Sequence, residues 1–497
     1  MAVPALRVRA VNDRPVAADG RYVLYWMTGA RRTRWNHALD RAVEVAHDLG
    51  KPLLVLEALR CGYAWASPRL HAFVLQGMND NAAACARAGV TYLPYVEPRA
   101  DAGKGLLAAL AAPACAVVTD DVPCFFLPRM LAAAATQVPV RLEAVDANGV
   151  LPLAATAKAF PTAYAFRRFL QRELPAHLAA PPRAAPLARA GRLAGAVVPR
   201  AVLERWPRAG RALLAARPEA LAALPLDATV GPVATRGGAT AAEEALTTFL
   251  ARRLARYGER NQPDADAASG LSPWLHFGHV ASHEVVARVL ARERVDAADL
   301  TPGGNGAREG WWGASAAAEG FLDQVVTWRE LGAVFCRHRP HDYDRYASLP
   351  PWAQATLGAH ARDARPVVYD LATLDAARTH DEVWNAAQRE LVRTGRMHNY
   401  LRMLWGKKVL EWSPTPEEAL ETLLHLNNRY ALDGRDPNSY AGIFWTFGRF
   451  DRPWAPEREI FGTIRYMSSA NTKRKLALKA YLARFGAAPV QGDLGLT

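Results

Sequence analysis

Hydrophobic residues in the first 150 positions form short runs of β-branched and aromatic side chains, and stretches of helical length separate these runs. Such runs predict strands, and the stretches between them predict helices, most clearly over 33–49 and 70–88. The predicted strands are 22–26, 53–56, 90–96, 116–119 and 138–145. Because connections of this length join parallel strands, the pattern predicts an α/β domain with a parallel sheet over residues 1–175.

Small and acidic residues follow two of the predicted strands. Thr28-Gly29 comes after the first strand, and Thr119-Asp120-Asp121 ends the fourth. Ligands of parallel sheets bind at this edge, so we expect a binding site there. The chain has neither GxGxxG directly after a strand nor GxxxxGK followed by Ser or Thr, so no signature of a dinucleotide or triphosphate site names the ligand.

The pattern changes after about residue 175. Residues 176–238 are rich in Ala, Pro and Arg, which predicts an interdomain connection that contains some helix. Residues 239–497 are almost purely helical in pattern, which predicts an all-α second domain, and the capping box Thr415 to Glu418 starts one of its helices. Two apolar faces mark further helices there: Leu246, Phe249, Leu250, Leu254 and Tyr257 on one, and Leu401, Trp405, Val409 and Trp412 on the other.

Charge narrows the range of partners. The 497 residues include 61 Lys and Arg against 48 Asp and Glu, a net charge of +13, and 51% of the residues are hydrophobic. A folded protein with this excess favours polyanions such as nucleic acid or an acidic membrane surface, although an arginine-rich proteome produces the same excess without one. No apolar stretch is long enough for a signal core or a membrane span, so we expect a cytoplasmic protein.

Residues of the metal-binding types are scattered. The five cysteines form no CxxC pair, so we expect reduced thiols and neither a zinc site nor an iron–sulfur cluster. His276, His279 and His283 fall at helical spacing, but no carboxylate or cysteine completes a ligand set. The sequence therefore predicts no metal.

Three polar residues lie on apolar helical faces, where burying an unpaired polar group costs a few kcal/mol. Asn427 continues a leucine stripe, which indicates either an inward partner or a hydrogen bond to a neighbouring helix. Glu330 lies at the edge of an apolar face, where it serves a site or an ion pair with a nearby arginine. Arg402 either pairs with a carboxylate, for which Asp433 is available, or reaches solvent.

Aromatic and hydroxyl residues of the second half add two ambiguous signals. Ten of the 14 tryptophans follow residue 235. Most tryptophans are core residues, but this density with interleaved arginine is also typical of stacking on a planar cofactor or on nucleobases. The turn from Ser269 to Ser272 offers hydroxyls and backbone amides directly before a helix, which is typical of a phosphate site and equally of an ordinary helix start.

Four segments carry a family resemblance: SGLSPWLHFGHVASHEV, VWNAAQRELVRTGRMHNYLRMLWGKKVLEWSPTPEEALE, ALDGRDPNSYAGIFW and REIFGTIRYMSSANTKRK. They resemble the flavin-binding domain of class II cyclobutane pyrimidine dimer DNA photolyases, in order from about residue 239 to 482. The segment YVLYWMTGARRTRWNHALDRAVEVA resembles the family's opening strand and helix more loosely, because Thr28-Gly29-Ala30 replaces the usual acidic and Gln positions.

The resemblance implies a Rossmann-like antenna domain followed by an all-α domain that holds FAD in a U shape. Light then drives the fully reduced flavin to pass one electron to a pyrimidine dimer flipped out of DNA, and the electron returns after the ring splits. The matching motifs imply that Arg402 pairs with Asp433 beside the isoalloxazine ring, that Asn427 faces flavin N5, and that Asn399 belongs to the same site. The FAD phosphates would be held by Tyr257, Ser269, Gly270, Leu271 and Ser272.

Other matching positions imply an electron relay. Trp405 and Trp384 match the tryptophan pair that passes electrons to photo-oxidised flavin, with Trp405 nearer the ring. Trp412 shares the face of Trp405, and we expect it to be a packing residue.

The resemblance also implies contacts with DNA. Glu330, Met403 and Trp445 match positions that contact the dimer, through a carboxylate on its base edge and through a thioether and an indole packed on it. Arg465 and the basic run at 473–479 would meet phosphates without sequence preference, although such a run also fits a solvated helix face.

Several departures from the family pattern bear on the site. His279 stands where members commonly have Gln, and Asn399 where many class II sequences have Gly, so we expect altered flavin tuning. The helix after Glu330 lacks a Trp to brace the other side of the dimer.

Two other functions stay open from the sequence. A cryptochrome-type photoreceptor holds the same flavin without repair, and the intact lesion-contact positions and the short stretch after Phe485 argue against it. A non-enzymatic basic nucleic-acid-binding protein needs no flavin. A second, antenna chromophore is not identified, so a deazaflavin, a folate and an empty pocket are all open. We expect a monomer whose partner is UV-damaged DNA and not a membrane.

Overall fold

A six-stranded sheet forms the centre of the amino-terminal half. The computed structural model, which describes residues 2–191, 193 and 195–486, orders its strands β1-β6-β5-β2-β3-β4. Neighbouring strands are parallel except β1 and β6, which are antiparallel. The strands are β1 (Val8–Ala10), β2 (Tyr22–Met27), β3 (Leu53–Leu59), β4 (Thr91–Val96), β5 (Ala114–Asp120) and β6 (Arg141–Val145). The five predicted strands are confirmed, and the hydrophobic pattern missed β1 because three residues are too few to show a periodicity.

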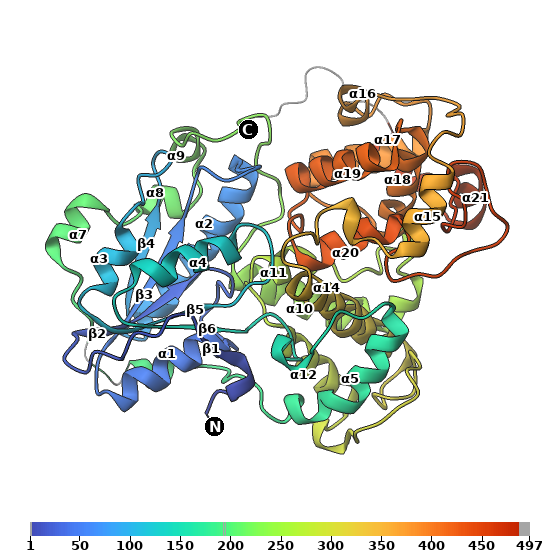
Figure 1. Cartoon of the computed structure of the whole chain (residues 1–497). Coiled ribbons are helices and arrows are strands. Elements are labelled where there is room, and N and C mark those ends of the chain that lie inside the picture. Colours follow the sequence, from blue (N-terminus) through green and yellow to red (C-terminus); the bar gives the residue numbers. More distant parts are fainter. Residues whose placement is uncertain (1, 192, 194, 487–497) are drawn as a thin grey trace.

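Helices cover both faces of this sheet (Figure 1). Successive residues of β2 point to opposite faces, so that Tyr22 and Leu24 pack toward α3 (Leu106–Ala111) and α4 (Leu127–Gln137), while Val23 and Tyr25 pack toward α1 (His37–Asp48). Burial on both faces explains why the central strands are continuously hydrophobic. The Asn36 side chain accepts hydrogen bonds from two backbone N–H groups of the first turn and caps α1, which begins four residues later than the predicted 33.

The segment predicted as an interdomain connection packs mainly on the α/β half. It contains the short helices α6 (Leu187–Ala190), α7 (Arg200–Arg205), α8 (Arg211–Leu214) and α9 (Pro218–Ala222). Trp206 is buried against Leu106, and its indole N–H donates to the Ala102 carbonyl at 2.9 Å. Helices α8 and α9 contact α2 (Pro68–Arg87).

The boundary predicted at residue 175 requires a correction. Helix α5 (Ala163–Leu178) lies with the helical half in Figure 1, beside α12 (Ser282–Glu293). Its residues Phe166 and Leu170 belong to the same hydrophobic cluster as Val285 of α12, and Arg167 forms a buried ion pair with Asp323 at 2.8 Å. Helix α5 therefore belongs to the core of the helical half, because its apolar face packs against the helices there and not against the sheet.

Short helices and 3₁₀ turns connect the longer helices of the carboxy-terminal half. Leu254 and Tyr257, predicted on one α-helical face with Leu246, lie in the 3₁₀ turn η3 (Leu254–Glu259) but are buried as expected. The other elements preceding the site helices are α10 (Ala239–Arg252), η4 (Pro263–Ala265), α11 (Ser272–His276), η5 (Ala297–Asp299), α13 (Ala316–Leu322), the π-helical η6 (Asp323–Trp328), α14 (Arg329–His338), η7 (Tyr346–Ser348), α15 (Pro351–Ala359) and α16 (Leu371–Asp375). The site helices and those after them are α17 (Glu382–Thr394), α18 (Asn399–Trp412), α19 (Pro416–Tyr430), α20 (Pro437–Thr446), α21 (Ser469–Lys475) and α22 (Lys479–Phe485).

A buried arginine joins the two halves. Arg69, in the first turn of α2, donates hydrogen bonds to the carbonyl oxygens of Val392 and Tyr430 in the helical half at 2.6 and 2.8 Å. Burial lowers the pKa of Arg69 to about 10. The guanidinium thus satisfies carbonyls at the ends of two helices that carry site residues, α17 and α19.

Candidate functional site

Two tryptophans stack in the core of the helical half. The ring centroids of Trp384 on α17 and Trp405 on α18 are 6.4 Å apart, with ring planes at 10°. The Trp384 indole N–H donates to the Trp405 carbonyl at 3.1 Å, and the Trp405 indole N–H donates to Oε1 of Gln388 at 3.0 Å. Both rings are buried and both N–H donors are satisfied, so the pair is held in one orientation.

Trp412, predicted to be a packing residue, lies against the same pair. Its ring centroid is 5.6 Å from that of Trp384, at 67°. Tyr369 contacts the far side of Trp412 with centroids 5.4 Å apart. Aromatic contact therefore continues from Trp405 to Tyr369, and the sequence pattern alone did not indicate this continuation.

The predicted pairing of Arg402 with Asp433 is confirmed. The two side chains are joined by hydrogen bonds of 3.1 and 3.3 Å. Burial opposes ionisation of Asp433, but the Arg402 charge and hydrogen bonds from Arg402 and Ser272 outweigh it, so the pKa of Asp433 lies below its usual value. Arg402 precedes Trp405 by three residues on α18, which places the ion pair and the stacked indoles along one helix.

Asn427 points inward from α19, as its place in the leucine stripe predicts. The side chain is buried, and its amide donates to Oγ of Ser439 on α20 at 2.7 Å. This bond supports the interpretation as a helix-packing residue and uses one of the two amide protons, while a further inward partner stays a prediction.

The predicted phosphate turn lies against a second arginine. Gly270 has a φ of +71°, and a Cβ built on it would lie 2.3 Å from a guanidinium nitrogen of Arg396. The side chain of Leu271 is buried, and Leu271 N–H donates to Oγ of Ser269 at 3.4 Å. Ser272 contacts Asp433, so this turn and the Arg402 ion pair form one continuous group.

Two other predicted cofactor residues lie in different surroundings. Tyr257 is buried among Phe249 and Phe321, with the Arg260 guanidinium 5.0 Å from its ring centroid. Burial raises the pKa of Tyr257 to about 12. Asn399 is exposed at the start of α18. Among the described residues, no hydrogen bond or ion pair joins either side chain to the turn at Ser269–Ser272.

Glu330, interpreted from the motif match as a dimer contact, is engaged by the backbone of the protein itself in this structure. Its carboxylate is buried and accepts hydrogen bonds from the backbone N–H groups of Val150 and Leu151 at 2.7 and 2.9 Å. A Cβ on Gly149 would lie 2.6 Å from the Glu330 carboxyl carbon, so the glycine leaves room for the carboxylate in this position. Burial raises the pKa of Glu330 to about 7. The alternative, an ion pair with an arginine, is not formed among the described residues. The carboxylate instead binds backbone amides of the loop that follows β6.

The lesion-contact candidates Met403 and Trp445 are half-buried on α18 and α20, which pack together. Arg465 was expected to meet phosphates, but it forms an ion pair with Asp451 at 2.9 Å and stacks on Trp454 with 3.8 Å from its guanidinium carbon to the ring centroid. The same guanidinium lies 5.6 Å from the Trp445 ring centroid. Arg465 therefore braces two indoles, and its expected contact with DNA phosphates stays a prediction.

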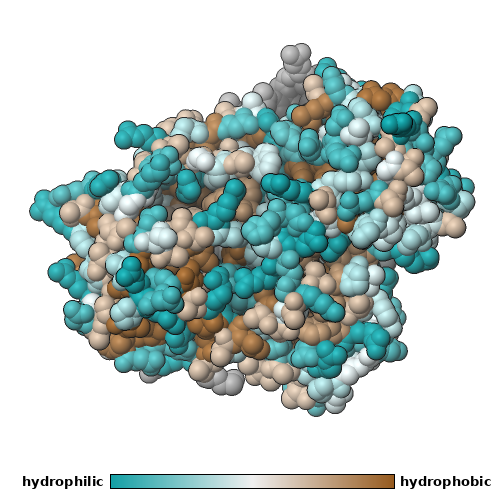
Figure 2. Space-filling model, in the orientation of Figure 1, coloured by the Kyte–Doolittle hydropathy of each residue, from teal (hydrophilic) through white to brown (hydrophobic). Residues whose placement is uncertain are grey.

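The basic run is also partly engaged. Lys473 on α21 pairs with Glu382 at 2.6 Å, and Arg474 donates to the Asn471 side chain at 2.8 Å. Lys475 and Lys479 are exposed. Figure 2 shows hydrophilic residues spread over both halves of this face. Hydrophobic residues are visible among these hydrophilic residues.

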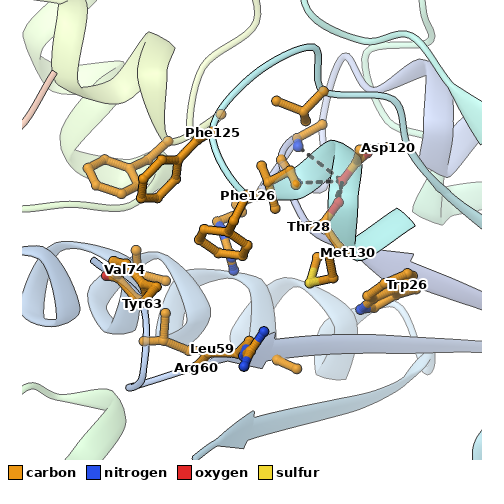
Figure 3. A pocket seen from close by; sticks show the side chains of 18 of the residues that line it. Trp26, Thr28, Leu59, Arg60, Tyr63, Val74, Asp120, Phe125, Phe126 and Met130 are labelled. Carbon is orange, nitrogen blue, oxygen red and sulfur yellow. Dashed lines mark hydrogen bonds between the residues drawn. The ribbon is translucent and has the colours of Figure 1, made fainter. Parts of the chain in front are cut away.

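A cavity of about 660 Å³ opens at the carboxyl ends of β2 and β5, where the sequence predicts a binding site. Figure 3 shows the rings of Tyr63, Phe125 and Phe126 toward one end and Trp26 toward the other. Oδ2 of Asp120 accepts hydrogen bonds from three successive backbone N–H groups, of Thr28, Gly29 and Ala30, and so fixes the turn that edges the cavity. Basic residues at its wall include Arg60, Lys104 and Arg129.

His279 has a packing role. Its ring stacks on Phe73 of α2 at 5.2 Å, and its Nδ1 accepts from the Gly238 N–H at 2.9 Å. Burial lowers the pKa of His279 to about 3. The prediction that it alters flavin tuning finds no contact to support it, because the ring is engaged by Phe73 of α2 and by Gly238 at the start of α10. Among the residues with described placement, no group of three or more His, Cys, Asp or Glu is arranged to hold a metal ion.

Comparison with known proteins decides the family. The chain is 35% identical over 487 residues to the deoxyribodipyrimidine photo-lyase of Methanothermobacter thermautotrophicus, covering 97% of this chain and 98% of that protein. It is 34% identical to the deoxyribodipyrimidine photo-lyase of Oryza sativa subsp. japonica and 32% identical to that of Potorous tridactylus, over 96% and 94% of this chain and 90% and 82% of theirs. The chain belongs to the deoxyribodipyrimidine photo-lyase family.

Solved structures support the photo-lyase fold. A class III photolyase from Agrobacterium tumefaciens superposes with a TM-score of 0.67 at 17% identity, covering 94% of this chain and 86% of that one. A Synechocystis cryptochrome superposes with a TM-score of 0.66 at 16% identity, covering 94% and 88%. No family model matches the chain.

A π-helical turn in this photo-lyase family member was not predicted from the sequence. The helix that carries Glu330 contains the π-helical turn η6, and the half-buried side chains of that turn are Gln324 and Trp328. Single π turns occur mostly at functional sites, because the extra residue turns side chains out of the regular face. Helical spacing assumes 3.6 residues per turn, so the residue pattern gave no indication of this π turn. No described helix is both long and apolar enough to cross a membrane.

Proposed function

We propose that this photo-lyase repairs cyclobutane pyrimidine dimers in UV-damaged DNA with light, and that it is a class II enzyme acting as a monomer. The observation that carries the proposal is the stacking of Trp384 of α17 on Trp405 of α18, since α18 also carries Arg402 of the Arg402–Asp433 ion pair. Buried stacked indoles suit electron transfer, and a half-buried ion pair beside them suits a polar planar cofactor. The motifs shared with class II photolyases support the class.

The residues of this group fit FAD. A flavin ring edge carries hydrogen-bond donors and acceptors, and the Arg402–Asp433 pair presents both. Asn427 keeps one amide proton beyond its bond to Ser439, which suits the flavin N5 expected there. Gly270 allows the backbone to approach closely, and the buried Nε of Arg253 has no hydrogen-bond partner among the described groups, which suits an anion near the phosphate turn.

When bound, reduced FAD would supply the photoexcited electron that opens the cyclobutane ring. The chain's own residues hold and isolate this chemistry. Trp384 and Trp405 pass an electron from the protein to the flavin. The hydrogen bonds of their indole N–H groups keep the stack fixed. Met403 and Trp445 form an apolar and aromatic surface for the extruded dimer. Extruding nucleotides from DNA costs a few kcal/mol, and the cost is lower for damaged nucleotides than for intact ones.

We further propose that the cavity at the strand ends holds a planar antenna chromophore. Aromatic rings line a volume suited to a fused-ring molecule, and the basic wall suits an acidic tail. A deazaflavin and a folate both have these features. Reconstitution with each, followed by separation and absorption spectroscopy, distinguishes them, and Phe126→Ala should lower retention of the one that binds. Equal failure of both chromophores to bind the unchanged protein would contradict the assignment.

One experiment separates the remaining functions. The purified chain is reconstituted with FAD, reduced with light, and given a dimer-containing oligonucleotide under blue light, with a dark sample as control. Repair appears as recovery of the absorbance of the two pyrimidines that formed the dimer. Flavin photoreduction without repair would instead indicate a photoreceptor, and a chain that binds no FAD would indicate a basic nucleic-acid-binding protein.

A further inference from the structure

Lys407 is a buried cation to which the proposed repair chemistry assigns no role. Its side chain is 0% exposed in the middle of α18, two residues after Trp405. Its ammonium donates to the Thr446 carbonyl oxygen at 2.5 Å, and no carboxylate of the described residues lies within ion-pair distance of it. An ammonium has three donors, so burial with one acceptor is unfavourable unless another group compensates.

The compensating group is the ring of Trp445. The Lys407 ammonium lies 5.0 Å from the ring centroid of Trp445, within the range of a cation–π interaction. The Arg465 guanidinium carbon lies 5.6 Å from the same centroid. Trp445 thus contacts two cations, one of them buried on α18 and the other held by Asp451.

Close helix packing fixes the position of Lys407. A Cβ on Gly406 would lie 2.6 Å from Oγ1 of Thr446, so α18 and α20 approach as closely as a glycine permits. The lysine stem therefore has a narrow space between the two helices. Its ammonium reaches the end of α20, where Trp445 and Thr446 lie.

We propose that Lys407 is a positioning residue that holds the Trp445 indole in the orientation that packs on the pyrimidine dimer. This inference rests on the proposed function, because it takes Trp445 as a surface for the lesion. The lysine touches neither the dimer nor the flavin in this arrangement and acts only through the indole.

The hold depends on the charge of Lys407. Burial lowers the pKa of Lys407 to about 7. Two charged residues of the segment after α20 act on it as well: Asp451 raises this pKa and Arg465 lowers it. A neutral amine is not attracted to the ring face, so we expect the hold on Trp445 to weaken as pH rises from 6 to 8.

The test compares Lys407→Met with Lys408→Met. Lys408 is the next residue of α18, is also buried, and pairs with Glu411 away from Trp445, so it is a matched control. Binding of a dimer-containing oligonucleotide and of the undamaged duplex is measured from pH 6 to 8, together with flavin content and photoreduction. We expect Lys407→Met to weaken lesion binding roughly tenfold at pH 6, to remove its pH dependence, and to leave the undamaged duplex and photoreduction unchanged. Wild-type lesion binding in Lys407→Met, or equal weakening in Lys408→Met, would overturn the proposal.

A second measurement needs no DNA and no folded variant at position 407. The chain is labelled with 5-fluorotryptophan, and the Trp445 resonance is assigned with Trp445→Phe. This resonance should shift between pH 6 and 8.5 with a midpoint near the pKa of about 7. A resonance that stays constant over that range would overturn the role of Lys407. If the resonance shifts but the unchanged protein does not prefer damaged DNA, the repair function fails while the Lys407–Trp445 coupling stands.

Discussion

Trp384 lies almost parallel to Trp405 and donates its indole N–H to the Trp405 backbone carbonyl. The two residues come from different helices, α17 and α18, so helix packing sets their overlap and the hydrogen bond prevents rotation of the Trp384 ring. An electron that leaves Trp405 can be replaced from Trp384 without any movement of side chains. This geometry suits the relay that we propose for the pair.

Replacement of Trp405 by phenylalanine should separate photoreduction from repair. Without the inner indole, light should no longer reduce oxidised flavin, yet chemically reduced protein should still repair dimers. Absorption changes under blue light measure the first property, and an oligonucleotide repair assay measures the second. Trp274→Phe serves as a control, because that indole donates to the Arg236 carbonyl and contacts Phe73. Normal photoreduction in Trp405→Phe would refute the relay.

Replacement of Asp433 by asparagine should weaken flavin binding. The change leaves Arg402, which is partly buried, without its charged partner, and a lost charged hydrogen bond of about 2 kcal/mol corresponds to roughly a thirtyfold rise in Kd. Titration of the apoprotein with FAD, followed by flavin fluorescence, checks the change. Glu204→Gln removes a solvent-exposed ion pair with Arg200 and should leave the Kd unchanged. Unaltered affinity in Asp433→Asn would show that the ion pair lies outside the cofactor site.

Replacement of Glu330 by glutamine should affect stability and not repair. The amide of glutamine satisfies one backbone N–H of the pair at Val150 and Leu151 and opposes the other, which costs about 1–3 kcal/mol. Chemical denaturation at pH 7 measures the loss, and Glu417→Gln, on the first turn of α19, is the control. Repair per flavin-loaded molecule should be unchanged. A large fall in repair without a change in stability would restore Glu330 as a lesion contact.

The same carboxylate predicts a pH dependence. Because the pKa of Glu330 is raised from 4.5 to about 7, the folded state holds its proton at pH values where the unfolded state has lost it. Its contribution to the free energy of unfolding is therefore full below pH 4.5 and is lost as pH rises through 7. Denaturation from pH 5 to 8 should show a shallower decline in Glu330→Gln than in the wild type. Identical slopes in both proteins would contradict the buried acid.

Buried histidines predict the opposite trend in acid. Burial lowers the pKa of His37 to about 2 and that of His279 to about 3, and the ring of His37 lies 5.1 Å from that of His283. The unfolded chain binds protons at these residues below pH 6.5 while the folded chain does not, so each residue lowers stability by about 1.4 kcal/mol per pH unit below 6.5. His37→Leu should therefore reduce the acid sensitivity of unfolding. The exposed His341→Gln should not, and an unchanged slope in His37→Leu would contradict the prediction.

Much of the fold followed from residue patterns. Continuous hydrophobic runs such as 53–56 predicted central parallel strands, since a strand covered on both faces has no polar side. The Thr415–Glu418 capping box predicted the start of α19, where Thr415 Oγ1 accepts from the Glu418 N–H at 3.2 Å. Strand β1 and the placement of α5 did not follow, because each depends on a partner distant in the sequence.

The site divides in the same way. The sequence by itself determined that Asn427 and Arg402 lie on apolar helical faces and need polar partners, because burying such groups unpaired is too costly. Only the tertiary structure decided which partners they meet, that Glu330 accepts hydrogen bonds from the backbone of Val150 and Leu151, and that the Lys407 ammonium lies against the ring of Trp445. A helical period places a residue on a face, but the identity of the neighbouring element depends on packing between segments far apart in the chain.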